Sequence, residues 1–159
     1  MVIILLKILI VLMACCSMEA VAWLSHKYLM HGPLWILHRD HHKKESYSFF
    51  EQNDFFFLIF AIPGMIALLF GMRNGYNWLF WMGIGICLYG MMYFLVHDVF
   101  IHQRLKIFRH SDTVYLKAIR RAHKMHHKHL DKEDGECFGM LWVPKKYFRE
   151  MKTGKNAAK

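Results

Sequence analysis

Histidine is the residue of this sequence whose spacing most clearly indicates chemistry. Of twelve histidines, ten fall into four groups, spaced as His26-x4-His31, His38-x2-His41-His42, His97-x4-His102 and His123-x2-His126-His127. Neutral imidazoles bind iron, zinc, copper or nickel. Ten of them are too many for one ion and suffice for two ions with five ligands each. The sequence therefore predicts a dimetal site made of all ten.

The spacing within each group indicates which side chains can converge. Residues at i, i+3 and i+4 share one face of a helix, which brings together the imidazoles of His38, His41 and His42, and likewise those of the last group. Residues at i and i+5 lie about 140° apart on an ideal helix. His26/His31 and His97/His102 therefore either serve different metals or lie on locally distorted helices.

Two other uses of metal are compatible with many histidines, namely structural zinc binding and metal transport. A closed structural zinc site needs four ligands and commonly includes cysteine, but the four cysteines form no CxxC pair. A metal transporter is expected to hold its ligands near the middle of the bilayer, whereas these histidines flank the apolar runs. Both uses are less favoured than a catalytic site.

Long apolar runs must position these histidines. Hydrophobic residues make up 55% of the 159-residue chain. Residues 55–72 and 75–96 each reach about 27–33 Å as a helix, enough to cross a bilayer. A third run covers residues 1–24 and is interrupted only by Lys7 and Glu19. We expect one all-α domain over residues 1–159, an integral membrane bundle of about three to four transmembrane helices, spanning about 2–24, 55–72 and 75–96.

The start of the chain has a second interpretation. Leu12-Met13-Ala14-Cys15 loosely resembles a lipoprotein cleavage site, but no basic region precedes the apolar stretch. The stretch also continues without a turn signal to Gly32-Pro33. We therefore expect a first helix that is retained and reaches about residue 31.

Charge is divided unevenly along the chain. Residues 1–102 carry six basic and six acidic side chains, whereas residues 103–159 carry fifteen and six. A basic tail is compatible with nucleic-acid binding, but in a membrane protein it marks the cytoplasmic side. We expect no nucleic-acid partner, and a bacterial inner-membrane protein whose histidines and tail face the cytoplasm. Near residues 105–122, an interfacial helix is favoured over a fourth membrane helix.

The four histidine groups resemble those of the bacterial β-carotene 3-hydroxylases, within the membrane fatty acid hydroxylase superfamily. The resemblance covers about residues 20–145. Related ketolases and sterol oxidases typically have a shorter first group, H-x3-H. His110 and His129 lie outside the shared groups, and we interpret both as solvated or supporting residues. Further shared motifs are Met30-His31-Gly32, Asn53-Asp54, His97-Asp98, His102-Gln103-Arg104, Ala122-His123 and Cys137-Phe138-Gly139.

The resemblance implies a non-haem diiron oxygenase, with O2 as co-substrate. It would hydroxylate the β-ionone ring at C-3, converting β-carotene to β-cryptoxanthin and then zeaxanthin. Ferredoxin with its NAD(P)H-dependent reductase would supply electrons, and the absence of a GxGxxG motif fits an outside donor. The metal ligands would be the ten grouped histidines, with no further catalytic residue. The alternatives are an acyl-chain or sterol hydroxylase and a metal-handling membrane protein without redox turnover.

Other residues have less specific signals. Asp40, Asp54 and Asp98 lie close to ligands and could accept a hydrogen bond from a metal-bound imidazole, or simply be solvated. Glu19 lies inside an apolar span, where an ionisable group is costly, and the sequence indicates no specific role for it. Zinc could replace iron in purified protein, because its affinity is higher. Aromatic residues form either a substrate channel or an ordinary interfacial belt; these are Trp23, Phe55, Phe57, Tyr89, Tyr93 and Phe94.

Overall fold

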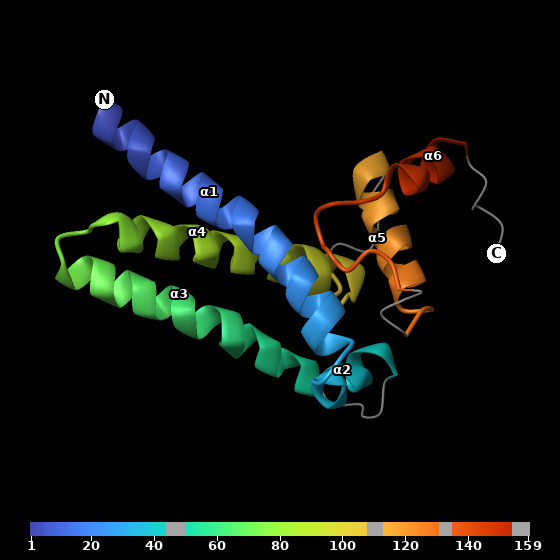
Figure 1. Cartoon of the computed structure of the whole chain (residues 1–159). Coiled ribbons are helices and arrows are strands. Elements are labelled where there is room, and N and C mark those ends of the chain that lie inside the picture. The colour runs from blue at the N-terminus through green and yellow to red at the C-terminus, as the bar shows by residue number, and fades with distance from the viewer. Residues whose placement is uncertain (44–49, 108–112, 131–134, 154–159) are drawn as a thin grey trace.

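Three long helices dominate the computed structural model, which describes residues 1–43, 50–107, 113–130 and 135–153. Helix α1 (Val2–Ser25) continues into η1 (His26–Met30), and α4 (Trp78–Tyr93) continues into η3 (Phe94–Ile101). Helix α3 (Phe55–Arg73) pairs with α4 as a hairpin (Figure 1). All three are long and apolar enough to cross a membrane. The predicted number of spanning helices is confirmed for the described residues.

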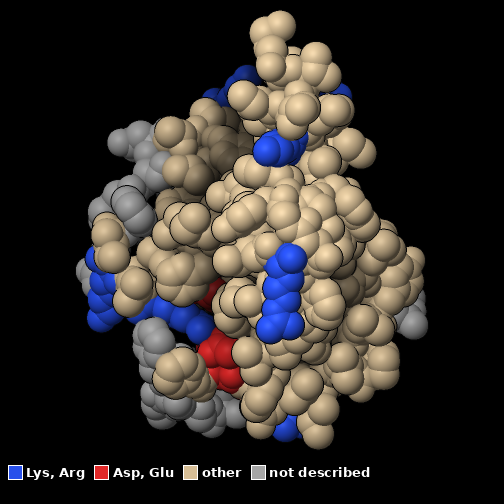
Figure 2. All heavy atoms as spheres, turned by 90° about the vertical axis from the view of Figure 1, so that its left-hand side faces the viewer, with Lys and Arg blue, Asp and Glu red and all other residues tan. Residues whose placement is uncertain are grey.

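The shorter elements lie at one end of these helices (Figure 1). They are α2 (Trp35–His42), the 3-10 turn η2 (Gln52–Asp54), α5 (Val114–His126) and α6 (Lys145–Thr153). The N-terminus and the α3–α4 turn lie at the opposite end. Figure 2 looks at that opposite end and shows mostly uncharged side chains, with a few lysines and arginines and a small area of acidic side chains. No strand occurs among the described residues, which confirms the all-α prediction.

The α3–α4 turn follows the expected sequence signals. Helix α3 ends at Arg73, and Gly75 has a φ of 71°, a conformation that glycine adopts without strain. The Asn77 side chain then accepts a hydrogen bond of 3.0 Å from the Leu79 amide and caps the next helix. Because of this cap, α4 begins at Trp78, three residues later than the predicted boundary at 75.

Small residues let the spanning helices pack closely. A Cβ atom on Gly71 would lie 2.3 Å from the Phe80 nitrogen, within the hairpin. A Cβ on Gly85 would lie 2.5 Å from the carbonyl oxygen of Val11, between α4 and α1. Backbones this close are typical of membrane helices, where glycine allows contact that larger residues prevent.

Helices α5 and α6 form a separate small core beside the spanning helices. Thr113 caps α5, which buries Ala118 and Ala122 against Tyr147 of α6. Helix α5 has 13 residues and is not among the helices that could cross a membrane. Its buried face also includes His123 and His126, so this helix presents two histidines toward the spanning helices.

Candidate metal centre

The ten histidines predicted as ligands converge into two neighbouring groups. In each group the candidate ligand atoms lie within 4.8 Å of one another. The second group gains a fifth member, because Nε2 of His127 lies 2.9 Å from Nε2 of His123. Its other members are His41, His97, His102 and His123. The first group consists of His26, His31, His38, His42 and His126.

Both H-x4-H motifs lie on π-helical turns. Residues His26–Met30 and Phe94–Ile101 are π-helical. The His31 amide donates to the His26 carbonyl at 3.0 Å, and the His102 amide donates to the His97 carbonyl at 2.9 Å. An i→i+5 hydrogen bond places residues five apart above one another. The distortion therefore brings each pair into a single group, which decides between the two alternatives left by the spacing.

Hydrogen bonds at Nδ1 fix the tautomer of four histidines in the first group. A carbonyl oxygen only accepts, so a ring nitrogen that contacts one must carry the hydrogen. Each Nδ1 therefore donates, and each Nε2 keeps its lone pair. The donor and acceptor pairs are His26 to Phe138 O (2.9 Å), His31 to Leu130 O (2.7 Å), His126 to Glu136 O (3.0 Å) and His38 to Asn53 Oδ1 (2.7 Å).

The remaining lone pairs face one another. Nε2 of His26 lies 3.0 Å from Nε2 of His38, and Nε2 of His31 lies 3.3 Å from Nε2 of His126. Neither atom of these pairs has a hydrogen to donate, so the approach is repulsive without a cation between them. Two nitrogens that bind one ion at about 2.1 Å and at right angles lie about 3.0 Å apart. The donor set of the first group thus fits a metal ion.

Burial keeps these imidazoles neutral, as metal binding requires. It lowers the pKa of His38 and His102 to about 3. It lowers the pKa of His126 to about 2 and that of His127 to about 4. It also lowers the pKa of His41, whose Nε2 is buried without a partner among the described residues. That orphaned nitrogen belongs to the second group and fits a metal ligand equally well.

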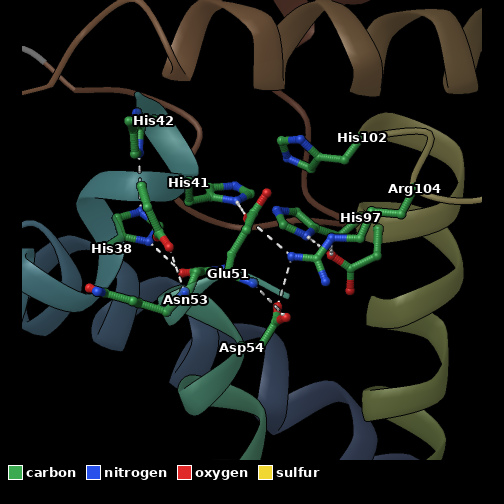
Figure 3. Close-up of polar contacts among 12 residues, drawn as sticks. His38, His41, His42, Glu51, Asn53, Asp54, His97, His102 and Arg104 are labelled. Carbon is green, nitrogen blue, oxygen red and sulfur yellow. Dashed lines mark hydrogen bonds and ion pairs between the residues drawn. The ribbon is translucent and has the colours of Figure 1, made fainter. Parts of the chain in front are cut away.

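Charged side chains form an ionic network that contacts the Nδ1 atoms of two histidines in the second group (Figure 3). Nδ1 of His41 donates to Glu51 at 3.1 Å, and Nδ1 of His97 donates to Asp98 at 3.2 Å. Arg104 lies between these carboxylates, 3.0 Å from Glu51 and 3.6 Å from Asp98. It also donates to Asp54 at 2.7 Å. Carboxylates behind imidazoles orient ligands and raise their basicity.

The three predicted supporting acids differ in their contacts. Asp98 contacts a grouped histidine directly. Asp54 instead accepts from Arg104 and from the Glu51 amide. Asp40 accepts from the Gln52 amide. His129 is half-buried and belongs to neither group, and His110 lies outside the described residues.

Several groups that contact the histidines were not predicted from the sequence. Glu51, Asn53 and Arg104 each contact a histidine or its carboxylate, and their signal was their position beside a spanning helix or a histidine motif. The carbonyl oxygens of Glu136 and Phe138 also contact histidines. Every residue has a carbonyl, so no residue type could have marked these two.

An apolar cavity of about 770 Å³ opens beside the histidines. His26, His97 and His123 line its polar end, while Met65 and Ile86 line it further along α3 and α4. Of the aromatic residues proposed for a channel, two do not line it, namely Trp23 and Phe55. The four that do are Phe57, Tyr89, Tyr93 and Phe94.

The chain is similar to known hydroxylases over most of its length. Residues 11–144 match the fatty acid hydroxylase family. The β-carotene hydroxylase of Pantoea ananas is 39% identical over 136 residues, which is 86% of this chain and 77% of that protein. The β-carotene hydroxylase of Pseudescherichia vulneris is 37% identical, with the same coverage of both chains. The chloroplastic β-carotene 3-hydroxylase of Gentiana lutea is 36% identical over 83% of this chain and 41% of its own length. No solved structure matches the chain significantly.

Proposed function

This chain belongs to the fatty acid hydroxylase family and is a hydroxylase, and from that premise we propose that it hydroxylates the β-ionone ring of carotenoids at C-3. The substrate would be β-carotene, the intermediate β-cryptoxanthin and the final product zeaxanthin. The observation that carries the proposal is the pair of five-histidine groups at the polar end of an apolar cavity.

Each group would hold one iron ion through the Nε2 atoms of its five histidines. Bound iron supplies O2 activation and the oxidising power to break an unactivated C–H bond, which acid–base side chains cannot do. The protein contributes fixed tautomers, through the carbonyl and carboxylate partners at Nδ1. It also keeps the imidazoles neutral by burying them.

The cavity wall suits a hydrocarbon substrate. Phe57, Phe60 and Ile86 line it, and most of its other lining residues are apolar too. An apolar substrate would bind by burial of its surface, at about 25 cal/mol per Å². The ring would then lie toward His26 and His97, and the polyene would extend between α3 and α4.

Membrane orientation and electron supply complete the proposal. All ten histidines lie at the end of the spanning helices that also carries the basic α5 and α6. The positive-inside rule would place this end in the cytoplasm, at the bacterial inner membrane. Reducing one oxygen atom to water requires two electrons and two protons. We propose that ferredoxin and an NAD(P)H-dependent reductase deliver the electrons there.

The test is pigment analysis of β-carotene-producing bacteria that express the chain with a competent reductase. The intact chain should accumulate zeaxanthin. The His126→Ala variant should accumulate none, because a ligand of the first group is lost. His129→Ala is the matched control and should behave like the intact chain, since His129 belongs to neither group.

Unchanged β-carotene from well-expressed, iron-loaded protein would contradict the carotenoid proposal. The same membranes would then be analysed for hydroxylated acyl chains and sterols. Zeaxanthin from the His126→Ala variant would contradict the role of the histidine groups.

A further inference from the structure

Glu19 is an ionisable residue inside the first spanning helix, and it makes three hydrogen bonds there. Its Oε1 accepts from the Leu141 amide at 2.8 Å and from the Trp142 amide at 2.9 Å. Its Oε2 accepts from the Tyr89 hydroxyl at 2.8 Å. A carboxyl group within a membrane span is costly unless it is paired, and such residues are commonly functional. Glu19 thus joins α1, α4 and the chain beyond α5.

The segment that Glu19 holds is itself part of the metal centre. We call residues 136–142 the carbonyl segment. The Phe138 carbonyl accepts from His26 and the Glu136 carbonyl accepts from His126, both in the first group. The Phe138 ring is buried and lies 5.2 Å from the His31 ring, centre to centre. Three of the five histidines of this group therefore contact one short segment.

The carbonyl segment depends on stabilising contacts from outside it, because its own backbone is strained. Cys137, between the two accepting carbonyls, has a φ of 60°, which is unfavourable for a residue with a side chain. No regular helix includes residues 136–142. The hydrogen bonds from Leu141 and Trp142 to Glu19 fix one end, and the Tyr147 hydroxyl fixes the other by donating to Glu136 at 2.6 Å.

We propose that Glu19 is a positioning residue for the first metal group. It holds the carbonyl segment so that the Phe138 and Glu136 carbonyls set the tautomer and orientation of His26 and His126. Through Tyr89, which lines the cavity, the same carboxyl group ties the substrate wall to the metal centre. This inference rests on the proposed dimetal function, and it assigns a role to a residue that is not itself one of the ten proposed ligands.

Four variants separate positioning from general stability. Glu19→Leu removes all three hydrogen bonds. Glu19→Gln keeps them, because its amide oxygen accepts from both backbone amides and its amide nitrogen donates to the Tyr89 hydroxyl. Gly139→Ala leaves Glu19 in place, but its Cβ would lie 2.8 Å from Glu19 Oε1 and displace the flexible carboxyl group from the segment. Glu150→Leu, on α6, is the control, because Glu150 pairs with Arg121 and does not line the cavity.

The measurement is iron per chain, on full-length protein reconstituted with ferrous iron in detergent, beside helix content and pigment output. The intact chain, Glu19→Gln and Glu150→Leu should bind two ions. Glu19→Leu and Gly139→Ala should keep their helix content and bind about one, a twofold loss. In a His126→Ala background, which already lacks a first-group ligand, Glu19→Leu should cause no further loss.

Three results would overturn the inference. The first is that Glu19→Leu and Gly139→Ala both bind two ions per chain. The second is that metal is lost equally from both groups. The third is that Glu19→Gln binds less metal than the intact chain. The inference and the proposed function can fail separately. An intact chain that binds two ions but forms no hydroxylated carotenoid contradicts the function alone, whereas metal-replete Glu19→Leu and Gly139→Ala contradict the positioning role alone.

Discussion

At the scale of single residues, the groups that accept hydrogen bonds from Nδ1 fix the orientation of the histidines. In the first group, backbone carbonyls and one amide side chain accept from Nδ1. In the second group, carboxylates do so, and Arg104 balances their charge. A carboxylate donates more electron density to an imidazole than a carbonyl does. The two groups therefore offer different electronic environments, although both consist of histidine.

Arg104 makes the second group sensitive to a single substitution. Its side chain is 14% exposed and faces Glu51, Asp54 and Asp98. We expect Arg104→Gln to lower the free energy of unfolding by about 2 kcal/mol, because three carboxylates then lie together without a cation. Arg104→Lys should lose less, since it keeps the charge but cannot reach all three. Denaturant unfolding in detergent measures both.

The control for Arg104 is Arg73→Gln, at the exposed end of α3. That change should leave stability within about 0.5 kcal/mol. Equal effects at positions 104 and 73 would mean that the ionic network contributes nothing.

The neutral histidines also predict how the metal-free protein responds to pH. Burial lowers the pKa of His38 and His102 to about 3, from the value of 6.5 expected in the unfolded chain. Below pH 6.5 the unfolded chain therefore binds protons that the folded chain does not. The free energy of unfolding should fall steadily as the pH is lowered from 6.5 to about 4. Urea titrations of metal-free protein at several pH values measure this; constant or rising stability would contradict it.

At the scale of elements, the π-helical turns are the decisive feature. Each π-helical turn contains one residue more than an α-helical turn. The two turns lie at His26–Met30 and within Phe94–Ile101. Each turn keeps two histidines together while setting the rotation of a long helix relative to the metal centre. This is how α1 can present both His26 to the metal group and Glu19 to the carbonyl segment.

Removing one residue from the first turn tests this link. Deleting Tyr28, which is largely exposed, would convert H-x4-H to H-x3-H and allow an α-helical turn. The rest of α1 would then rotate by about 100° and shift by about 1.5 Å. We expect about half of the bound metal to be lost, because Glu19 no longer reaches Leu141. Metal analysis gives the result, with Tyr28→Ala as the length-preserving control. Full metal content in the deletion variant would refute the link.

The sequence predicted the elements better than it predicted their contacts. Hydropathy identified three spanning helices, because each carries exposed apolar side chains along its length, such as Leu9 on α1, Ile59 on α3 and Leu88 on α4. Spacing identified the faces of α2 and α5 that carry histidines. It left open how His26 and His31 could meet, because ideal helix geometry does not include a π turn. The carbonyl partners could not be predicted from the sequence, since their positions depend on the backbone path of residues 136–142 and not on their side chains.

At the scale of the whole molecule, the histidines join parts of the chain that share little other packing. They come from η1, α2, η3 and α5, and from the residues that directly follow η1, η3 and α5. A metal ion in each group would tie the spanning helices to α5 and, through it, to α6. Metal binding should therefore stabilise the whole fold and not one local loop.

Metal exchange separates this structural contribution from the redox contribution. Removing metal with a chelator should lower the melting temperature; each site contributes about 2.7 kcal/mol when free metal is 100 times its dissociation constant. Zinc should restore the melting temperature without restoring hydroxylation, because it has no redox chemistry. Melting curves and pigment assays on the same samples measure both. An unchanged melting temperature after complete metal removal would contradict the linkage between the groups and the fold.

The mouth of the cavity has a kinetic consequence. Several of its lining residues belong to the spanning helices and are exposed, including Phe57 at 63% and Met91 at 56%. A site that opens on the surface facing lipid takes up substrate that diffuses laterally within the bilayer. Its turnover would follow the mole fraction of substrate in the bilayer and not the amount per volume of suspension. Diluting the membrane with inert lipid would lower the turnover rate, whereas diluting the vesicles with buffer would leave the turnover rate of the enzyme unchanged.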